Sequence, residues 1–382
     1  MDCWLFAKLS LILQLKQIIM TLHCFNPEHD IALAANLSNF TAPHAGRQLR
    51  YDLGWLPALW AADGDAIFVD EISYSETAWR RFRQCAHLGN DHRRLTFADK
   101  RMLEKLPVAS VKPWGWDPAL RSQLQRLGVR PDILPSEAQT DQIRNCSSRQ
   151  LSCRLLPLLR KAGTIGESFV CRDEEEVEQL LSRYGQLVLK APWSSSGRGL
   201  RFLHDQHAGL SIHAGWLRNI LKSQGIVMAE PYYNKVKDFG LEFHVDKENH
   251  VSFLGLSLFH TKNGAYTGNI IATENHKREH LGKFISLQLV DEVASDICSL
   301  TEQLLGGCYQ GPFGVDMMVV AGNHDDHHSF LLHPCVELNL RRTMGHVALE
   351  LARWCNPTCD DDLVKVMRIE LTDHYQLKIN RL

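Results

Sequence analysis

Two acid-bearing segments in the last third of the chain carry residues that suit metal chemistry. GVDMMVV contains Asp316, and PCVELNL contains Glu337 and Asn339. A polar stretch separates the segments, so they can pair as an antiparallel hairpin that brings Asp316 beside Glu337. Glu337 and Asn339 share a face because side chains alternate along a strand. Two carboxylates and an amide oxygen suit Mg²⁺ or Mn²⁺ bound with phosphates; two solvent-facing strand acids are the alternative.

A lysine followed by a serine- and glycine-rich turn indicates a site for phosphate groups. The strand-like LVLKAP ends near Lys190, and PWSSSGRG follows at 192–199. Serine and glycine let backbone N–H groups approach a ligand, and Lys190 adds a positive charge. The GxxxxGK[ST] motif is absent and GxGxxG is incomplete. An ordinary hairpin turn therefore stays as the second interpretation.

A third segment, VMAEPYY, is an apolar strand that ends at Glu230 and Pro231, before Tyr232. A strand-to-loop crossover leaves backbone groups without partners. These groups can read the edge of an adenine, and apolar side chains nearby can enclose the ring. A plain connection between strands is the alternative.

These three segments, in this order, resemble the ATP-grasp superfamily, which includes biotin carboxylase, D-alanine–D-alanine ligase and glutathione synthetase. The resemblance covers roughly residues 140–350, and VELNLRRTMGH is similar to the E-x-N-x-R run of that superfamily. It implies an enzyme that uses ATP and Mg²⁺ to activate a carboxylate as an acyl phosphate. An amine or thiol would then attack, releasing phosphate beside ADP.

The resemblance also implies roles for individual residues. Lys190 and Arg341 would steady the transferring phosphate, and Asp316, Glu337 and Asn339 would hold the metal. The nucleotide would contact Arg149 (with Arg154 as second choice), Lys190, Ser195, Ser196, Gly197, Gly199, Glu230, Pro231, Tyr232 and, at the ribose, Asp238.

Candidate substrate residues lie in three places. Asn26, Glu28 and His29 follow the first strand, a ligand-facing position in an open α/β sheet; a polar loop with Asp30 as helix cap is the alternative. His260 lies in a turn that would border the acceptor pocket under the ATP-grasp interpretation, and is otherwise part of a hairpin. The guanidinium of Arg342 could grip a substrate carboxylate.

The elements that must position these residues suggest an α/β (α+β) chain. Strands alternate with helices up to about residue 135, which predicts a parallel sheet, and the β-rich runs beyond 226 predict antiparallel sheets. Residues 1–19 are expected to be an extension, with Met20 as a possible true start. We further expect a parallel α/β pre-ATP-grasp domain at 20–135, a small ATP-grasp lobe at 136–225 and a large lobe at 226–382. The polar stretch 136–150 is expected to be a boundary or linker, and a helix starting at 346 is expected to be terminal.

Composition limits the remaining functions. The chain has 382 residues, 45% of them hydrophobic and 23% charged, and a net charge of −2, so no general positive field would hold nucleic acid. Residues 2–20 are apolar but interrupted by charges, and a membrane span needs about 20 uninterrupted apolar residues. Eleven cysteines without a CxxC pair favour a reducing compartment, the cytoplasm.

Three functional hypotheses remain open. The first is a ligase for a carboxylate and an amine or thiol that the sequence does not identify, and a homodimer is possible. The second is a small-molecule phosphotransferase that uses the same ATP site. The third is a non-catalytic nucleotide-binding protein.

Overall fold

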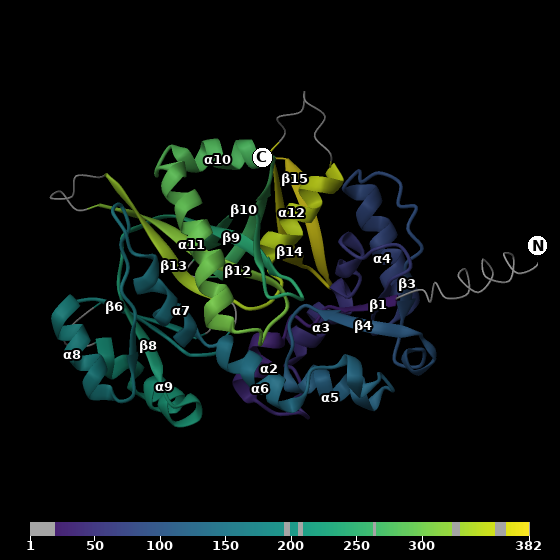
Figure 1. The fold of residues 1–382 in the computed structure, drawn as a ribbon, viewed down its shortest axis with the longest axis horizontal. Helices are drawn as coiled ribbons and strands as arrows, with labels where there is room; N and C mark the ends of the chain where they lie inside the picture. Colours follow the sequence, from purple (N-terminus) through teal and green to yellow (C-terminus); the bar gives the residue numbers. More distant parts are fainter. Residues whose placement is uncertain are drawn as a thin grey trace, which may run out of the picture.

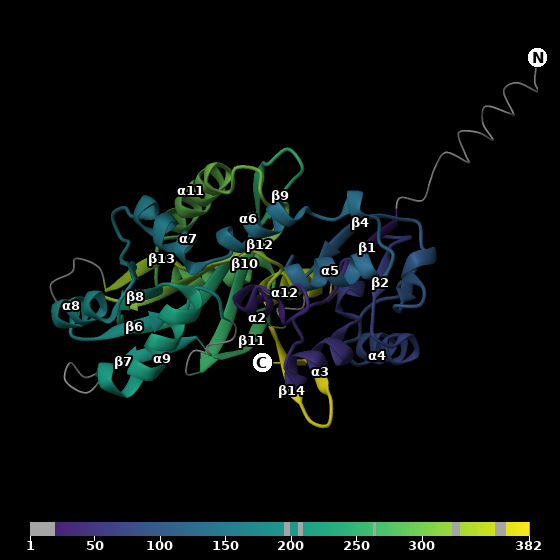
Figure 2. The ribbon, with the colours of Figure 1, turned by 90° about the horizontal axis from the view of Figure 1, so that it is seen from below.

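The computed structural model describes residues 20–194, 199–204, 209–262, 265–322, 329–355 and 364–381. Three sheets organise them: a parallel sheet near the N-terminus, a four-stranded antiparallel sheet and a seven-stranded antiparallel sheet. Figures 1 and 2 show the parallel domain at one end of the molecule and the small antiparallel sheet with α8 and α9 at the other. The seven-stranded sheet lies between them. This mixed α/β architecture is the predicted fold class.

The N-terminal domain contains a parallel sheet with strand order β3-β2-β1-β4. Its strands are β1 (Met20–Cys24), β2 (Ala66–Phe68), β3 (Thr96–Ala98) and β4 (Val108–Pro113). Its helices are α2 (His29–Ala35), α3 (His44–Leu53), α4 (Ile72–Cys85), α5 (Pro118–Arg126) and the short 3-10 turns η1 (Leu56–Leu59), η2 (Leu103–Lys105) and η3 (Pro131–Ile133). The loops after β1 and β2 meet at one edge of this sheet, where open α/β sheets bind ligands.

The small antiparallel sheet has the order β5-β8-β6-β7. It consists of β5 (Phe169–Cys171), β6 (Leu187–Lys190), β7 (Leu200–Leu203) and β8 (Val227–Pro231), covered by α8 (Glu174–Tyr184) and α9 (Gly209–Gln224). Leu187, Leu189 and Ala229 pack into the core beneath these helices. Lys190 and Glu230, which alternate with them, therefore point to the opposite face. A boundary at 225 would separate β8 from β5 and β6, with which it pairs.

The stretch 136–150 is helical and is not a linker. Ser136 and Gln139 form a capping box that starts α6 (Glu137–Cys146), and Ser148 caps α7 (Arg149–Leu155). The short turn η4 (Leu156–Leu159) follows. Ile143 is buried in the same core as the large sheet, so a single apolar face is enough to dock this polar helix.

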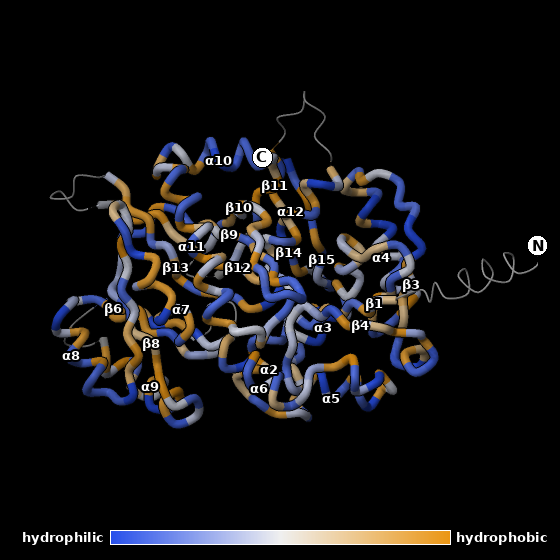
Figure 3. Tube along the Cα trace, in the orientation of Figure 1, coloured by the Kyte–Doolittle hydropathy of each residue, from blue (hydrophilic) through white to orange (hydrophobic). Residues whose placement is uncertain are grey.

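The large sheet has the order β13-β12-β9-β10-β11-β14-β15. Its strands are β9 (Lys235–Val245), β10 (Val251–Lys262), β11 (Ala265–Ile271), β12 (Gly311–Ala321), β13 (Phe330–Asn339), β14 (Lys365–Leu371) and β15 (Tyr375–Arg381). The helices in this part are α10 (Glu274–Gly282), α11 (Leu287–Leu305) and α12 (Met344–Cys355). Phe239, Phe243 and Phe313 are fully buried in the core shared with α7 and α11. In Figure 3, α10 is mostly blue, because most residues of its sequence ENHKREHLG are hydrophilic.

The expectation that α12 ends the fold is wrong. β14 and β15 follow it and join the edge of the large sheet beside β11. Met367 of β14 and Val347 of α12 are buried in one core with Trp55 of the N-terminal domain. The last two strands therefore complete an apolar contact that a terminal helix alone would leave partly uncovered. Within the described ranges, no helix has the length and apolar character needed to cross a membrane.

Candidate functional site

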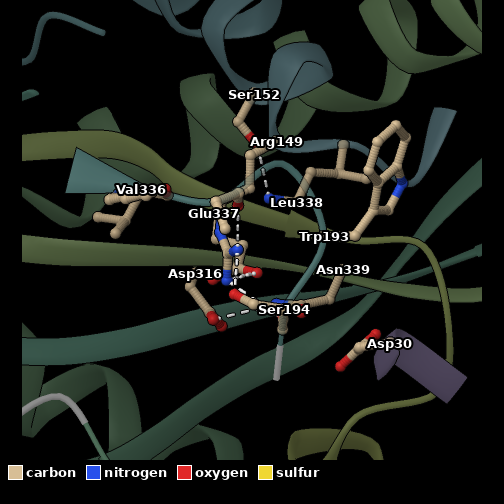
Figure 4. A network of polar contacts seen from close by, with 12 residues as sticks. Asp30, Arg149, Ser152, Trp193, Ser194, Asp316, Val336, Glu337, Leu338 and Asn339 are labelled. Atoms are coloured by element: carbon tan, nitrogen blue, oxygen red, sulfur yellow. Dashed lines mark hydrogen bonds and ion pairs between the residues drawn. The ribbon is translucent and has the colours of Figure 1, made fainter. Parts of the chain in front are cut away.

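The predicted pairing of the two acid-bearing segments is confirmed. β12 and β13 are antiparallel neighbours, and Asp316 lies directly opposite Glu337. The side-chain amide of Asn339 donates a hydrogen bond of 3.0 Å to Asp316 Oδ2. Figure 4 shows these three side chains gathered over the hairpin. Local alternation of side chains is the reason the sequence could predict this arrangement.

The carboxylates on this part of the sheet repel one another. Burial, with the nearby charges of Glu337 and Glu242, raises the pKa of Asp316 to about 8. Such a site gains from a cation that neutralises the acids. No group of three His, Cys, Asp or Glu side chains in the described residues is arranged to hold a metal by itself. Two carboxylates and one amide oxygen nevertheless fit Mg²⁺, which keeps several water and phosphate ligands.

Lys190 reaches the hairpin from the small sheet. Its Nζ lies 2.6 Å from Glu230 Oε2 and donates a 3.0 Å hydrogen bond to the carbonyl of Val336, the residue before Glu337. Both charged side chains are buried, and Ser168 Oγ donates to the other oxygen of Glu230 at 3.1 Å. The predicted phosphate lysine is therefore adjacent to the acids, and the Glu230 side chain serves to hold it.

Arg149 brings a second cation to the same place. Its Nη2 lies 2.7 Å from Glu337 Oε1. Its Nη1 donates hydrogen bonds of 2.6 Å to the carbonyl of Ala191 and to Ser194 Oγ, and Figure 4 shows this guanidinium between the hairpin and Ser194. Arg154, the second choice, is exposed.

Arg341 is held by Asp30, one of the polar residues after the first strand for which the sequence suggested either substrate binding or a helix cap. Asp30 of α2 accepts two hydrogen bonds from Arg341, at 2.9 Å from Nε and 2.8 Å from Nη2. Nη2 also donates to Asn339 Oδ1 at 3.0 Å. Burial raises the pKa of Asp30, but the charge and hydrogen bonds of Arg341 outweigh it and hold that pKa below its ordinary value. In the sequence, the only sign that Asp30 could be functional was its place in a run of polar residues after the first strand.

The turn after Lys190 is described in part. Ser195, Ser196 and Gly197 lie outside the described residues. Gly199 accepts a 2.9 Å hydrogen bond from the N–H of Ala191, and a Cβ added at Gly199 would lie 2.1 Å from Ser194 Oγ. Position 199 requires glycine because Ser194 lies too close for a side chain there. The turn joins the antiparallel strands β6 and β7.

The predicted adenine-binding segment needs one correction. The N–H of Tyr232 donates a 3.1 Å hydrogen bond to the carbonyl of Gln186, so strand pairing uses a group that was expected to be open to a base. Pro231 ends β8 beside it. The Tyr232 ring is 45% exposed and stands edge-on to His204, with ring centroids 5.0 Å apart. This segment therefore offers an aromatic surface and one backbone donor fewer than predicted.

Asp238 and His260 lie farther along the large sheet. Asp238 is two residues before Gly240, the partner of Asp316 in β12, so alternation places Asp238 on the same face as the hairpin acids. Its carboxylate is 2.6 Å from Lys235 Nζ and accepts a hydrogen bond from Thr261. His260 is exposed on β10.

The candidate substrate residues are separated. The Asn26 amide donates to Gly115 O at 2.8 Å and to Asp117 Oδ2 at 2.9 Å. Asn26 and Glu28 line a cavity of about 400 Å³ in the N-terminal domain. His29 faces the other side and, with Arg149 and Glu337, lines a cavity of about 10 Å³.

Arg342 has neighbours different from those of Arg341. Its guanidinium stacks on Trp60 of the N-terminal domain, 4.2 Å from the ring centroid. Burial lowers its pKa to about 10. Its backbone N–H donates to Trp114 O at 2.8 Å. Arg342 thus contacts the N-terminal domain, and its grip on a substrate carboxylate stays a prediction.

The chain resembles known proteins in structure and not in sequence. No family profile matches it, and no curated protein is similar to it in sequence. Solved structures do match. Biotin carboxylase from Campylobacter jejuni, in a complex with β-γ-ATP, has a TM-score of 0.53 and 11% identity over 92% of this chain and 75% of that one.

Two further structures have slightly lower scores. N5-carboxyaminoimidazole synthetase from Staphylococcus aureus, complexed with ADP, has a TM-score of 0.48 and 11% identity over 92% of this chain and 82% of that one. The biotin carboxylase domain of Hydrogenobacter thermophilus 2-oxoglutarate carboxylase has a TM-score of 0.49 and 12% identity over 91% and 74% of the two chains. The chain has the ATP-grasp fold, so the predicted resemblance is confirmed at the level of the fold.

Proposed function

We propose that this protein is an ATP- and Mg²⁺-dependent ligase that activates a carboxylate as an acyl phosphate for attack by an amine or thiol. One observation carries the proposal: Asp316, Glu337 and Asn339 gather on one hairpin beside Lys190 and Arg149, which come from separate elements. Oxygen ligands for a divalent ion and cations for phosphate are the two components that phosphoryl transfer requires.

Each residue has a defined part in this proposal. Asp316, Glu337 and Asn339 hold the divalent ion, which when bound supplies positive charge to the phosphate oxygens. Lys190 keeps its ammonium beside β13 through Glu230 and Val336 and donates to phosphate oxygens from there. Arg149 leaves Glu337 and turns its donors to the phosphates. No side chain acts as a nucleophile in this scheme.

Arg341 acts at the acceptor end of the site. Asn339 and Asp30 orient its guanidinium, so its charge lies next to the metal ligands before any substrate arrives. A fixed cation of this kind stabilises the negative charge that develops during transfer, and it requires little reorganisation. Asp238, on the same sheet face, is the proposed contact for the ribose.

The surroundings also suit this chemistry. The aromatic rings of Tyr232 and His204 provide a surface for the base at the end of β8. The segment 192–199 would cover the phosphates and exclude water, which protects an acyl phosphate from hydrolysis. All nine cysteines within the described residues are free thiols, which suits the cytoplasm as the place of the reaction.

Isothermal titration of ATP, with and without Mg²⁺, tests the proposal. We expect binding to wild-type protein that strengthens with Mg²⁺, and a Glu337→Gln variant that loses the Mg²⁺ dependence. Glu370→Gln is the matched control, because Glu370 pairs with Lys378 on the far edge of the sheet. Absence of ATP binding to folded wild-type protein would refute the proposal.

The products then identify the reaction. A ligase releases free phosphate only when both co-substrates are present. Phosphate retained on an acceptor would instead identify a phosphotransferase, and binding without turnover would identify a nucleotide-binding protein.

A further inference from the structure

A second cavity lies at the carboxyl edge of the N-terminal sheet, outside the phosphate site. Its volume is about 400 Å³, and it is lined by residues from the ends of β1 and β2 and from the start of α5. In open parallel sheets this edge is where small molecules bind. The cavity is also in the size range of small-molecule sites, about 300–1,000 Å³. Its position and volume therefore suit a ligand of its own.

One wall of this cavity offers carboxylates. Arg50 lies between Glu28, to which it donates from Nη1, and Asp70, to which Nε donates at 3.2 Å. Glu28 is 8% exposed, and its Oε2 is buried without a hydrogen-bond partner among the described residues. Burial is the main reason that the pKa of Glu28 is raised. A buried carboxylate oxygen without a partner is uncommon and indicates a missing donor.

The rim of the cavity offers cations. Arg47 donates from Nη1 to the carbonyl of Ala42 at 2.5 Å, and Arg126 donates from Nη1 to Ser122 Oγ at 2.7 Å. In the part of the chain that the structure describes, both of these hydrogen bonds go to uncharged oxygens. Each keeps further N–H donors, whose planar arrangement fits a carboxylate.

The lining of the cavity also includes apolar side chains. Phe40, Phe68 and Leu120 line the cavity together with the charged residues. A purely anionic ligand would leave the Glu28 oxygen without a partner, and a purely cationic ligand would leave the two arginines without one. A zwitterion with an apolar substituent satisfies all three parts of the lining.

We propose that this cavity binds an α-amino acid with an apolar side chain. Its ammonium group contacts Glu28, its carboxylate contacts Arg47 and Arg126, and its side chain packs against Phe40 and Phe68. This inference rests on the proposed ligase function, in which the amino acid is one of the two joined substrates.

The cavity and the phosphate site meet at one short helix. Glu28 immediately precedes α2 and lines the cavity, whereas Asp30 lies in the first turn of α2 and holds Arg341. A ligand that moves Glu28 thus acts on the same turn that positions Arg341. The substrate cavity is in this way linked to the cation that would face the transferring phosphate.

Thermal unfolding of the full chain, without nucleotide or metal, tests the inference. Each proteinogenic L-α-amino acid is added separately, and the N-acetyl and amide derivatives of any that bind are added next. We expect at least one apolar amino acid to raise Tm by about 2 °C or more, and neither derivative to do so, because each lacks one charge.

Variants locate the binding. Glu28→Gln and Arg126→Met should each abolish the Tm shift. Arg130→Met, an exposed residue whose recorded ion pair is with Asp132 of the same turn, should keep it. Because Arg126 is exposed, its variant remains folded even if Glu28→Gln does not.

The outcomes separate this inference from the proposed function. If no amino acid shifts Tm, or if the shift persists in Arg126→Met, the inference is wrong even where Mg²⁺–ATP binds normally. If an amino acid binds as expected while wild-type protein does not bind ATP, the ligase proposal fails and the assignment of the cavity stands.

Discussion

The phosphate site and the N-terminal cavity differ in how their charges are balanced. In the first, the chain pairs its own cations with its own acids: Arg149 with Glu337, Lys190 with Glu230 and Arg341 with Asp30. In the second, two rim arginines and one buried carboxylate oxygen have no such partner among the described residues. The associated cavities measure about 10 Å³ and 400 Å³.

The difference shows two ways to prepare a polar site. Mg²⁺ and the phosphates of ATP bring both signs of charge, so they can replace internal pairs with new pairs while leaving no charge isolated. Breaking such a pair without a replacement is unfavourable because one buried charge is left alone. A small zwitterion, by contrast, would meet two exposed arginines and a buried carboxylate oxygen that has no hydrogen-bond partner among the described residues.

The strongest test of this comparison is a substitution of Arg149 that should affect metal binding and ATP binding in opposite directions. In Arg149→Met, Glu337 loses its 2.7 Å partner and becomes available to a metal. Mn²⁺ binding, measured by electron paramagnetic resonance, should therefore tighten. ATP affinity should fall by about 30-fold, since a charge-assisted hydrogen bond contributes about 2 kcal/mol.

Arg154→Met provides the control, because Arg154 is an exposed residue of the same helix. An equal effect of the two variants, or weaker Mn²⁺ binding in Arg149→Met, would show that the pair does not compete with the metal.

The buried pair of Lys190 and Glu230 is tested by its effect on stability. Lys190→Met should lower the free energy of unfolding by about 3 kcal/mol, since it leaves a buried carboxylate unpaired. The double variant Lys190→Met/Glu230→Leu should recover most of that stability in urea titrations. Neither protein should bind ATP normally, because both lack the cation. Recovery of ATP binding in the double variant would contradict the proposed role of Lys190.

The contact between Asp30 of α2 and Arg341 predicts that the free energy of unfolding depends on pH. The pKa of Asp30 is lowered in the folded protein, so its stabilising effect is complete above its unfolded pKa of about 4 and is lost as the pH falls through the folded pKa. Asp30→Asn should lower the free energy of unfolding by about 1–3 kcal/mol at neutral pH. Denaturant titrations should show this difference narrowing only in acid. A difference that changes instead between pH 6 and 8 would point to another group.

The smallest effect is expected at Arg342. Arg342→Met removes the contact with Trp60 and should lower the free energy of unfolding by about 1 kcal/mol. ATP affinity should stay unchanged in the same calorimetric titration that detects the Lys190 variant. A marked loss of affinity would support the prediction that Arg342 contacts substrate.

Sequence patterns predicted the structure best where both partners lie in one local unit. Asp316 and Glu337 belong to consecutive strands of a hairpin, so alternation and a polar turn were sufficient to pair them. The polar composition of α6 hid its few apolar contacts, although the capping box at Ser136 was present in the sequence.

The sequence by itself determined which residues could provide metal ligands, phosphate cations and strand faces, because those properties belong to residue types and to neighbours along the chain. Only the tertiary structure decided their partners. Arg341 and Asp30 are 311 positions apart, and Lys190 and Val336 are 146 apart. β8 similarly joins the small sheet by pairing with β5 and β6. Contacts across such distances depend on how sheets and helices pack, and local propensity carries no information about that packing.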